Sequence, residues 1–339
     1  MPRRPRARLL ALAPVICLLA AVPARAAAPR RPDVEAPEAY LVDTATGQVL
    51  YRRRANAEVA IASTTKLMTA YVTLEREPLE RNLVEQPYYP DSADQSLAHL
   101  PSGVRYSVAT LLRAMLVPSG DDVANSLAID VGGTIPRFVR LMNRAAARLS
   151  LGRTHYTTPI GLDTPGNYST ARDLEVLALA LMRDPFFAAV VRDASVYVPG
   201  AGELVNTNDL LGSYPWVVGI KTGHTEDAGY CLVGAASSHG VNLISVVLGD
   251  PSEAARDDDT LALLRYGLAR ERGVPQGATG DSGATGASPI TARAASARRG
   301  AAPAGGSPAP IVWLLLGLTL LAGCSLGVVR WRSTETPRR

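Results

Sequence analysis

Ser63-Thr-Thr-Lys66 opens a segment with helical periodicity. The apolar residues that follow recur at helical spacing, which predicts a helix that begins near Ser63: Leu67, Met68, Tyr71 and Leu74. Residues three positions apart lie on the same face of a helix, so the Ser63 hydroxyl and the Lys66 amine are predicted to be neighbours.

This pair of side chains has the chemistry of an activated nucleophile. A serine hydroxyl reacts poorly unless a base lies beside it, and lysine is such a base only where burial or neighbouring cations favour its neutral form. Apolar residues flank the pair on both sides and indicate a buried site. Taken alone, the tetrapeptide is also typical of a serine that caps a helix and of an ordinary surface lysine.

Two shorter stretches follow, Ser119-Gly-Asp121 and Lys221-Thr-Gly223. Ser119 falls between a helix predicted over 107–116 and a second helix that begins at Asp121, where a hydroxyl can point into a cleft. The Lys221 stretch follows a β-type run, so it is predicted on the edge of the cleft, where a glycine allows close approach of a substrate. Taken alone, Ser119 is equally a helix cap, and the tripeptide a hairpin turn with a surface lysine.

The rest of this region alternates β-type runs with helical patterns. Two further helices are expected over 137–149 and 261–268. The first is amphipathic, with these residues inward: Phe138, Leu141, Met142, Ala145 and Leu149. The strands come in two groups, a hairpin over 40–51 and later runs over 216–220, 229–236 and 241–248. This order predicts an α+β fold, an antiparallel sheet packed with helices plus an all-helical region.

The three motif stretches, in this order along one chain, form the signature of class A β-lactamases and penicillin-binding proteins. Longer strings resemble a low-molecular-mass penicillin-binding protein, a serine-type D-alanyl-D-alanine carboxypeptidase. These strings are Ala62–Thr69, Pro159–Asp163, Tyr168–Leu174, Asn206–Leu211, Gly219–Thr225 and Ala228–Tyr230. The resemblance covers about 37–270 and implies a β-lactamase/transpeptidase-like fold, with the active site between the sheet and the all-helical region.

The resemblance also implies a reaction. Ser63 would be the nucleophile that attacks the D-Ala-D-Ala carbonyl of a peptidoglycan stem peptide, Lys66 the general base, and Ser119 the relay of a proton to the leaving amine. Water would then release a shortened stem peptide, and no cofactor or metal is implied. β-Lactams resemble the end of that peptide and would acylate Ser63 as covalent inhibitors.

The resemblance implies substrate-binding roles for a further set of residues: Asp121, Lys221, Thr222, Gly223, His224 and Arg256. Lys221 would support the hydroxyl network electrostatically, and Thr222 would bond the terminal carboxylate of the substrate. Backbone amides of Ser63 and His224 would form the oxyanion hole, which stabilises the developing negative charge. Arg256 would lie near the carboxylate, and the alternative for it is a solvated surface arginine.

Asp121 departs from the family pattern, in which the second stretch commonly ends in asparagine. Asparagine both donates and accepts hydrogen bonds, whereas an ionised aspartate only accepts. An ionised Asp121 beside Lys66 would favour the charged lysine and make it a poorer base. Alternatively, Asp121 is protonated, or turns with Asp122 toward the N-terminus of the helix.

Both ends of the chain carry membrane-related signals. Four early arginines, an apolar run over 9–22 and Ala24-Arg-Ala26 predict a signal peptide over 1–26, with an N-terminal anchor as the alternative. The uncharged run over 311–329 is long enough to span a bilayer. The basic tail 330–339 follows it and is predicted to be cytoplasmic. A buried core helix is the alternative for the run over 311–329.

Two regions lie between these ends. Residues 27–274 are predicted to form one catalytic domain. Residues 275–310 are rich in Ala, Gly, Ser, Thr and Pro, and are predicted to be a disordered linker that spans about 30–36 Å on average. The protein is therefore expected to be secreted across the cytoplasmic membrane and anchored to it by one C-terminal helix, with the catalytic domain outside.

The composition argues against several other classes of protein. Residues 27–310 hold 26 basic and 30 acidic side chains, which gives nucleic-acid binding no support. Cys231 is the single cysteine of that region, so no internal disulfide is expected there. The histidines lack the spacing of a metal site, and no glycine-rich phosphate loop is present.

Three alternative functions stay open at this point. A DD-endopeptidase or a transpeptidase would use the same acyl-enzyme with a different acceptor, and the acceptor is not encoded in these stretches. A class A β-lactamase would need a glutamate-bearing deacylation loop, where this chain has Ser169-Thr-Ala-Arg-Asp-Leu174. The third alternative is a non-catalytic scaffold that binds the cell wall, because Asp121 departs from the family pattern at the second motif.

Overall fold

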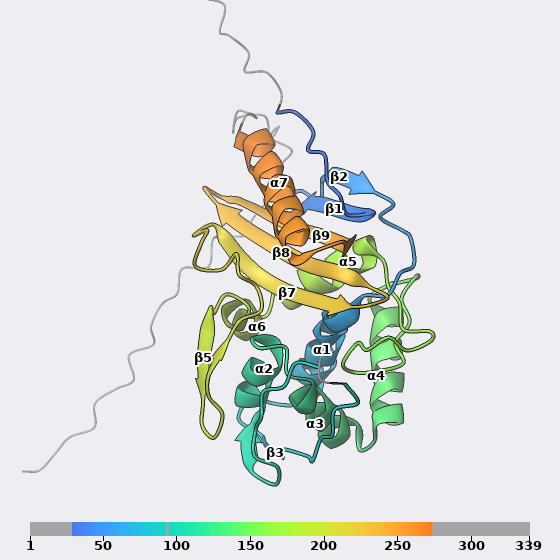
Figure 1. Cartoon of the computed structure of the whole chain (residues 1–339), viewed down its shortest axis with the longest axis vertical. Coiled ribbons are helices and arrows are strands. Elements are labelled where there is room, and N and C mark those ends of the chain that lie inside the picture. Colours follow the sequence, from blue (N-terminus) through green and yellow to red (C-terminus); the bar gives the residue numbers. More distant parts are fainter. Residues whose placement is uncertain (1–28, 93–94, 273–339) are drawn as a thin grey trace, which may run out of the picture. The chain divides into compact units, whose positions relative to one another are not determined.

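The computed structural model describes residues 29–92 and 95–272, which are built on a five-stranded antiparallel sheet in the order β2-β1-β9-β8-β7 (Figure 1). The strands are β1 (Glu38–Asp43), β2 (Val49–Arg53), β7 (Val217–Thr225), β8 (Gly229–Ser238) and β9 (Val241–Asp250). The N-terminal hairpin pairs with the last strand, so that Tyr40 lies opposite Val246. The first and last strands of the described chain therefore lie side by side in one sheet.

The predicted signal peptide 1–26, linker 275–310, membrane helix 311–329 and tail 330–339 lie outside the described residues. These assignments, and the domain limits 27 and 274, stay predictions. Over 29–92 and 95–272, no helix combines the length and the apolar character that crossing a bilayer requires.

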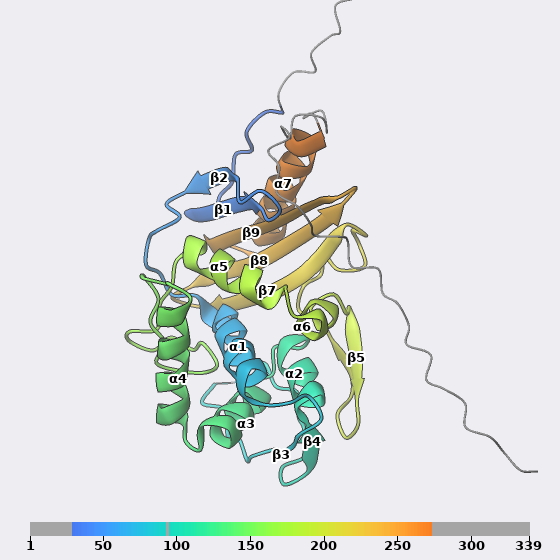
Figure 2. The same cartoon turned by 180° about the vertical axis from the view of Figure 1, so that it is seen from behind.

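Side chains alternate between the two faces of the sheet along each strand, and both faces carry buried apolar residues. Helices therefore cover both faces. α7 (Glu253–Arg272) covers one face and lies in front of the strands in Figure 1. Its leucines share a core with residues of the sheet that include Leu41, Leu232 and Val247. α5 (Ala171–Leu181) covers the opposite face (Figure 2), where a larger core includes Tyr40, Val42, Val233 and Val246.

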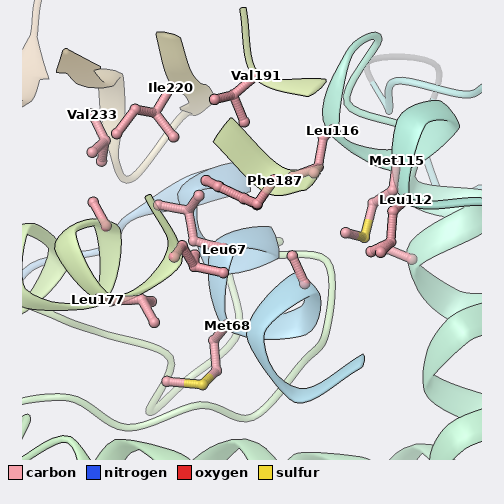
Figure 3. Packing of buried hydrophobic residues seen from close by; sticks show 14 of the residues in the cluster. Leu67, Met68, Leu112, Met115, Leu116, Leu177, Phe187, Val191, Ile220 and Val233 are labelled. Atoms are coloured by element: carbon pink, nitrogen blue, oxygen red, sulfur yellow. The ribbon is translucent and has the colours of Figure 1, made fainter. Parts of the chain in front are cut away.

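The larger core continues from the sheet into a helical region. α1 (Lys66–Arg76) runs through this region and contacts α2 (Val108–Leu116), α3 (Asp121–Gly132) and α4 (Ile135–Arg148). In Figure 3, Leu67 and Met68 of α1 lie in the same core as Leu177 of α5. A short 3₁₀ turn, η1 (Ala62–Thr65), leads into α1 at the end nearest the sheet.

The remaining elements are short. α6 is a single-turn helix at Pro185–Val190, and it contributes Phe187 to the larger core (Figure 3). Two small hairpins complete the described fold: β3 (Asn82–Val84) with β4 (Arg105–Ser107), and β5 (Ser195–Val198) with β6 (Gly202–Val205).

Polar caps explain where several helices begin. The Ser107 hydroxyl accepts the Thr110 amide at 3.2 Å at the start of α2. At the start of α4, the Thr134 hydroxyl accepts the Arg137 amide at 3.3 Å. At the start of α5, the Thr170 hydroxyl accepts the Asp173 amide at 3.0 Å. Each bond satisfies one of the amides that the first turn of a helix leaves without a partner.

Several elements differ in extent from the prediction. The helix expected from near Ser63 begins as the 3₁₀ turn, and the α-helix starts only at Lys66. β7 continues through the Lys221 stretch to Thr225, because its pairing with β8 continues that far. Leu149 caps α4 and is only partly buried. α5 has no counterpart among the predicted helices, although four of its buried residues recur at helical spacing: Ala171, Leu174, Ala178 and Leu181.

Glu85 lies beyond the end of β3 and is almost fully buried. It is 1% exposed, and neither carboxylate oxygen has a hydrogen-bond partner among the described residues. The pKa of Glu85 is raised to about 8, and burial is the largest cause. The Ser126 hydroxyl acts in the opposite direction, whereas the charges of Asp122 and Asp130 also raise the pKa. The folded protein therefore keeps a proton that the unfolded chain releases near pH 4.5.

We expect the free energy of unfolding to fall as the pH rises from about 4.5 to about 8, because the folded state binds more protons than the unfolded state in this interval. Glu85→Gln removes this loss and should stabilise the protein at pH 8 by several kcal/mol, at most about 4–5. Urea unfolding across this pH range measures the effect. The exposed Glu80→Gln is the matched control, and identical pH slopes for both variants would contradict the assignment.

Candidate active site

Ser63 lies in the 3₁₀ turn η1, directly against the edge strand β7. A Cβ atom at Gly223 would lie 2.9 Å from the Ser63 amide nitrogen and 3.1 Å from that of Thr64. A side chain at this position would therefore push the strand away from the turn. The absence of a side chain at Gly223 brings the backbone of β7 beside the predicted nucleophile.

Lys66 begins α1, is completely buried, and contacts three oxygen atoms. Its Nζ lies 2.7 Å from Ser63 Oγ, 2.6 Å from Asp121 Oδ1 and 3.0 Å from the Ile160 carbonyl oxygen. A charged lysine donates to all three. A neutral lysine donates two hydrogens to Asp121 and Ile160, and its lone pair is left to accept the Ser63 proton. The same geometry therefore suits the amine before and after it takes the proton.

Ser119 and Asp121 come from the break between α2 and α3. Ser119 adopts a φ of 67°, in the left-handed region, and its side chain lines the cleft above Ser63. The Asp121 carboxylate points to Lys66, and its amide donates to the Ser96 carbonyl at 2.8 Å. Asp122 instead accepts three backbone amides, those of Ala98, His99 and Val123. Asp121 therefore does not turn away with Asp122.

Lys221 lies in β7 and is 1% exposed. Burial lowers its pKa well below the usual range, the charge of Lys66 lowers it further, Asp121 raises it, and Arg256 lowers it. Its Nζ donates to the Thr222 carbonyl at 3.1 Å. Burial and the charge of Lys66 thus favour a neutral amine at Lys221, whereas the Asp121 carboxylate opposes this effect.

Thr222 and Arg256 lie in the same cleft as Ser63. The Thr222 hydroxyl is 2.6 Å from the hydroxyl of Thr207. Arg256, in the first turns of α7, is 2% exposed and forms ion pairs with Glu253 and Asp257 at 3.1 and 2.8 Å. A hydroxyl and a guanidinium within one cleft can together bind a carboxylate.

A loop after α4 completes the surroundings of Lys66. The Asn167 side chain donates to Thr65 Oγ1 and accepts the Thr157 amide, both at 3.2 Å, and so ties the loop to η1. Pro159 O accepts the Thr69 hydroxyl at 2.6 Å. A Cβ atom at Gly161 would lie only 2.0 Å from the Ala62 carbonyl oxygen. These contacts hold the Ile160 carbonyl against Lys66.

A cleft of about 800 Å³ opens over these groups. Most of the predicted site residues line it: Ser63, Ser119, Asp121, Thr222, Gly223, His224 and Arg256. Lys66 and Lys221 do not line it and are buried. The His224 ring is exposed and stacks on Tyr230, with ring centres 4.0 Å apart.

Sequence reasoning missed Thr207, Ile160 and Asn167. Thr207 and Ile160 lie in strings that carry the family resemblance, but nothing in their residue types indicates a role. Ile160 contributes a backbone carbonyl, which no sequence pattern marks. Over 29–92 and 95–272, no group of three or more histidine, cysteine or acidic side chains is placed to hold a metal ion.

A buried amine that contacts a serine hydroxyl beneath an open cleft is the arrangement of a serine hydrolase that works through an acyl-enzyme. The profile of the D-alanyl-D-alanine carboxypeptidase family matches residues 25–252. The chain therefore belongs to the D-alanyl-D-alanine carboxypeptidase family. The predicted family and the serine hydrolase class are confirmed.

Curated relatives carry the same description. The D-alanyl-D-alanine carboxypeptidase of Streptomyces sp. strain K15 is 35% identical over 271 residues, which is 74% of this chain and 92% of that protein. The D-alanyl-D-alanine carboxypeptidase DacD of Escherichia coli K12 is 35% identical over 257 residues, 70% of this chain. The match spans 64% of the length of DacD.

Solved structures confirm the predicted β-lactamase/transpeptidase-like fold. The crystal structure of the Streptomyces K15 DD-transpeptidase superposes with a TM-score of 0.67 at 35% identity, over 71% of this chain and 99% of that chain. The D-alanyl-D-alanine carboxypeptidase DacD of Francisella tularensis gives a TM-score of 0.66 at 28% identity, over 71% and 72% of the two chains.

Gly161→Ala should reduce acylation of Ser63 by about a hundredfold or more, because its Cβ would displace η1 and an ångström of misplacement costs about that much. Gly166→Ala is the matched control, since Gly166 also has a positive φ but its Cβ would meet nothing closer than 3.4 Å. The rate of covalent labelling by a fluorescent penicillin measures both variants. Equal rates would show that Gly161 does not set the position of Ser63.

Proposed function

We propose that this protein is a serine DD-carboxypeptidase that removes the terminal D-Ala from peptidoglycan pentapeptide stems through an acyl-enzyme on Ser63. The observation that carries the proposal is the contact of 2.7 Å between Lys66 Nζ and Ser63 Oγ at the floor of the cleft. Family membership supports the substrate, because the relatives are named D-alanyl-D-alanine carboxypeptidases.

In the acylation step, Lys66 accepts the hydroxyl proton of Ser63 while Oγ bonds to the carbonyl carbon of the penultimate D-Ala. The backbone amides of Ser63 and His224 stabilise the oxyanion. The proton moves from Lys66 through Ser119 to the leaving nitrogen, the C–N bond breaks, and the terminal D-Ala departs. Water then attacks the ester carbonyl and gives one proton to Lys66. This proton passes to Ser63 Oγ as the bond between Oγ and the acyl carbon breaks, and the shortened peptide leaves as a carboxylic acid.

A hydroxyl and a guanidinium in the cleft orient the substrate. Thr222 and Arg256 bind the terminal carboxylate, which places the scissile carbonyl over Ser63. Lys221 adds a nearby donor and little positive charge, because its burial favours the neutral amine. A β-lactam carries a carboxylate and a reactive amide bond, as the D-Ala-D-Ala end of the substrate does. We therefore propose that a β-lactam acylates Ser63 and is released slowly.

A transpeptidase or endopeptidase uses the same acyl-enzyme with another acceptor or donor peptide. One observation favours keeping this second candidate, because the K15 relative is named a carboxypeptidase in one comparison and a DD-transpeptidase in its crystal structure. Analysis of the products from linear and cross-linked muropeptides distinguishes the activities. Release of D-Ala from linear pentapeptides alone supports the carboxypeptidase.

We also propose that the catalytic domain acts outside the cytoplasmic membrane. The arguments are the signal peptide predicted over 1–26 and the apolar run over 311–329 with its basic tail. The linker over 275–310 would let the domain reach peptidoglycan at some distance from the bilayer. Cell fractionation after deletion of 311–339 tests the anchor, since loss of membrane association is expected.

Ser63→Ala should abolish both D-Ala release and the covalent adduct with penicillin, because the reacting oxygen is removed. Mass spectrometry of the labelled protein locates the adduct, and Ser213→Ala, which changes an exposed serine, is the control. An adduct that persists in Ser63→Ala would identify another nucleophile. An unmodified native protein that also fails to release D-Ala would instead support the wall-binding scaffold.

Asp121→Ala should slow acylation of Ser63 by about tenfold or more, because Lys66 loses an acceptor that lies 2.6 Å from its Nζ and a hydrogen bond to a charged group contributes about 1.5–3 kcal/mol. Asp33→Asn, a change at an exposed position, is the control for net charge. The rate of covalent labelling by a fluorescent penicillin measures both variants. A native rate in Asp121→Ala would contradict a supporting role of Asp121 beside Lys66.

A further inference from the structure

Arg256 is paired with two carboxylates of its own helix, those of Glu253 and Asp257. Its Nη2 lies 3.1 Å from Glu253 Oε1 and 2.8 Å from Asp257 Oδ1, and its Nε donates to the same Asp257 oxygen at 2.8 Å. Its own side chain is only 3% exposed. The guanidinium that receives the substrate carboxylate in the proposed function is therefore neutralised before substrate arrives.

The two carboxylates hold Arg256 in different ways. Asp257 is 18% exposed and contacts both Nε and Nη2. Glu253 is 56% exposed, reaches only Nη2 and, unlike Asp257, lines the cleft. Nη2 forms no hydrogen bond of acceptable geometry with any described residue, although both carboxylates lie within ion-pair distance. A donor in the cleft wall is thus left to a better-aligned acceptor.

We propose that Glu253 is an internal competitor for the terminal carboxylate of the substrate, and so a specificity-determining residue that sets KM. The inference rests on the proposed function, in which Arg256 binds that carboxylate. Glu253 lies within ion-pair distance of Nη2, and a peptide that ends in a free carboxylate displaces it. A peptide without this charge has no means of doing so, and the cleft discriminates against it.

The carboxylate of the substrate can readily replace the carboxylate of Glu253 at Arg256. The Glu253 side chain is 56% exposed, so water competes for its carboxylate and the substrate can replace it at Arg256. Glu253 lies in the first turn of α7, where the partial positive charge of the helix N-terminus stabilises it after it leaves Arg256. Asp257 stays in place and keeps the guanidinium oriented while the exchange takes place.

The test separates binding from chemistry in the full protein. Glu253→Gln should lower KM for diacetyl-Lys-D-Ala-D-Ala by about two- to fivefold with little change in kcat, as expected for loss of an exposed competing charge. Inhibition by the same peptide with a C-terminal amide should stay as it is in the native protein. Asp258→Asn removes one charge from the same helical turn at an exposed position, and should leave both constants unchanged.

An unchanged or raised KM in Glu253→Gln overturns the proposal, since a raised value means that Glu253 holds Arg256 in its productive position. Acylation by benzylpenicillin and by its methyl ester gives a second measure that needs no peptidase activity. Faster acylation by the free acid alone supports the competitor, whereas equal effects on acid and ester overturn it. If the native protein releases no D-Ala, the proposed function is wrong. The acylation rates with benzylpenicillin and its methyl ester then still test the role of Glu253.

Discussion

The contact of one buried amine with three oxygens is the constraint on which the rest of this site depends. Lys66 lies in the interior with no exposed surface, where an unpaired charge would be very costly. Ser63, Asp121 and the Ile160 carbonyl compensate it, and each comes from a different part of the chain. The 3₁₀ turn, the break before α3 and the loop after α4 must therefore meet at one point. Much of the fold around α1 serves to bring them there.

Charge balance in the site follows from the same arrangement. Two lysines and one aspartate are buried together, and burial with the field of Lys66 favours a neutral Lys221. Asp121 lies 2.6 Å from Lys66 Nζ and compensates the charge that Lys66 acquires when it takes the serine proton. An asparagine at this position would keep an acceptor oxygen but would lack the charge.

The position of the cleft at a junction explains its mixed character. β7 is an edge strand, so one side of its backbone is not paired within the sheet and faces η1 and the cleft. The helical region supplies the nucleophile, the base and the Ser119 loop, whereas the sheet and α7 supply Thr222 and Arg256. Chemistry and substrate orientation thus come from the two parts of the fold. Glycines at 161 and 223 allow these parts to approach closely.

The sequence by itself determined the family, the α+β class, the order of the main strands and most of the cleft residues, because helical and strand periodicities and short motifs are local properties. The predicted length was wrong where strand pairing decided it, as at β7, and α5 was not predicted although its buried residues recur at helical spacing. Only the tertiary structure placed Asp121 on Lys66 rather than at the helix N-terminus. It also brought the Ile160 carbonyl to the amine and Glu253 to Arg256. A backbone oxygen leaves no mark in a residue pattern, and the direction of a carboxylate depends on contacts between segments far apart in the chain.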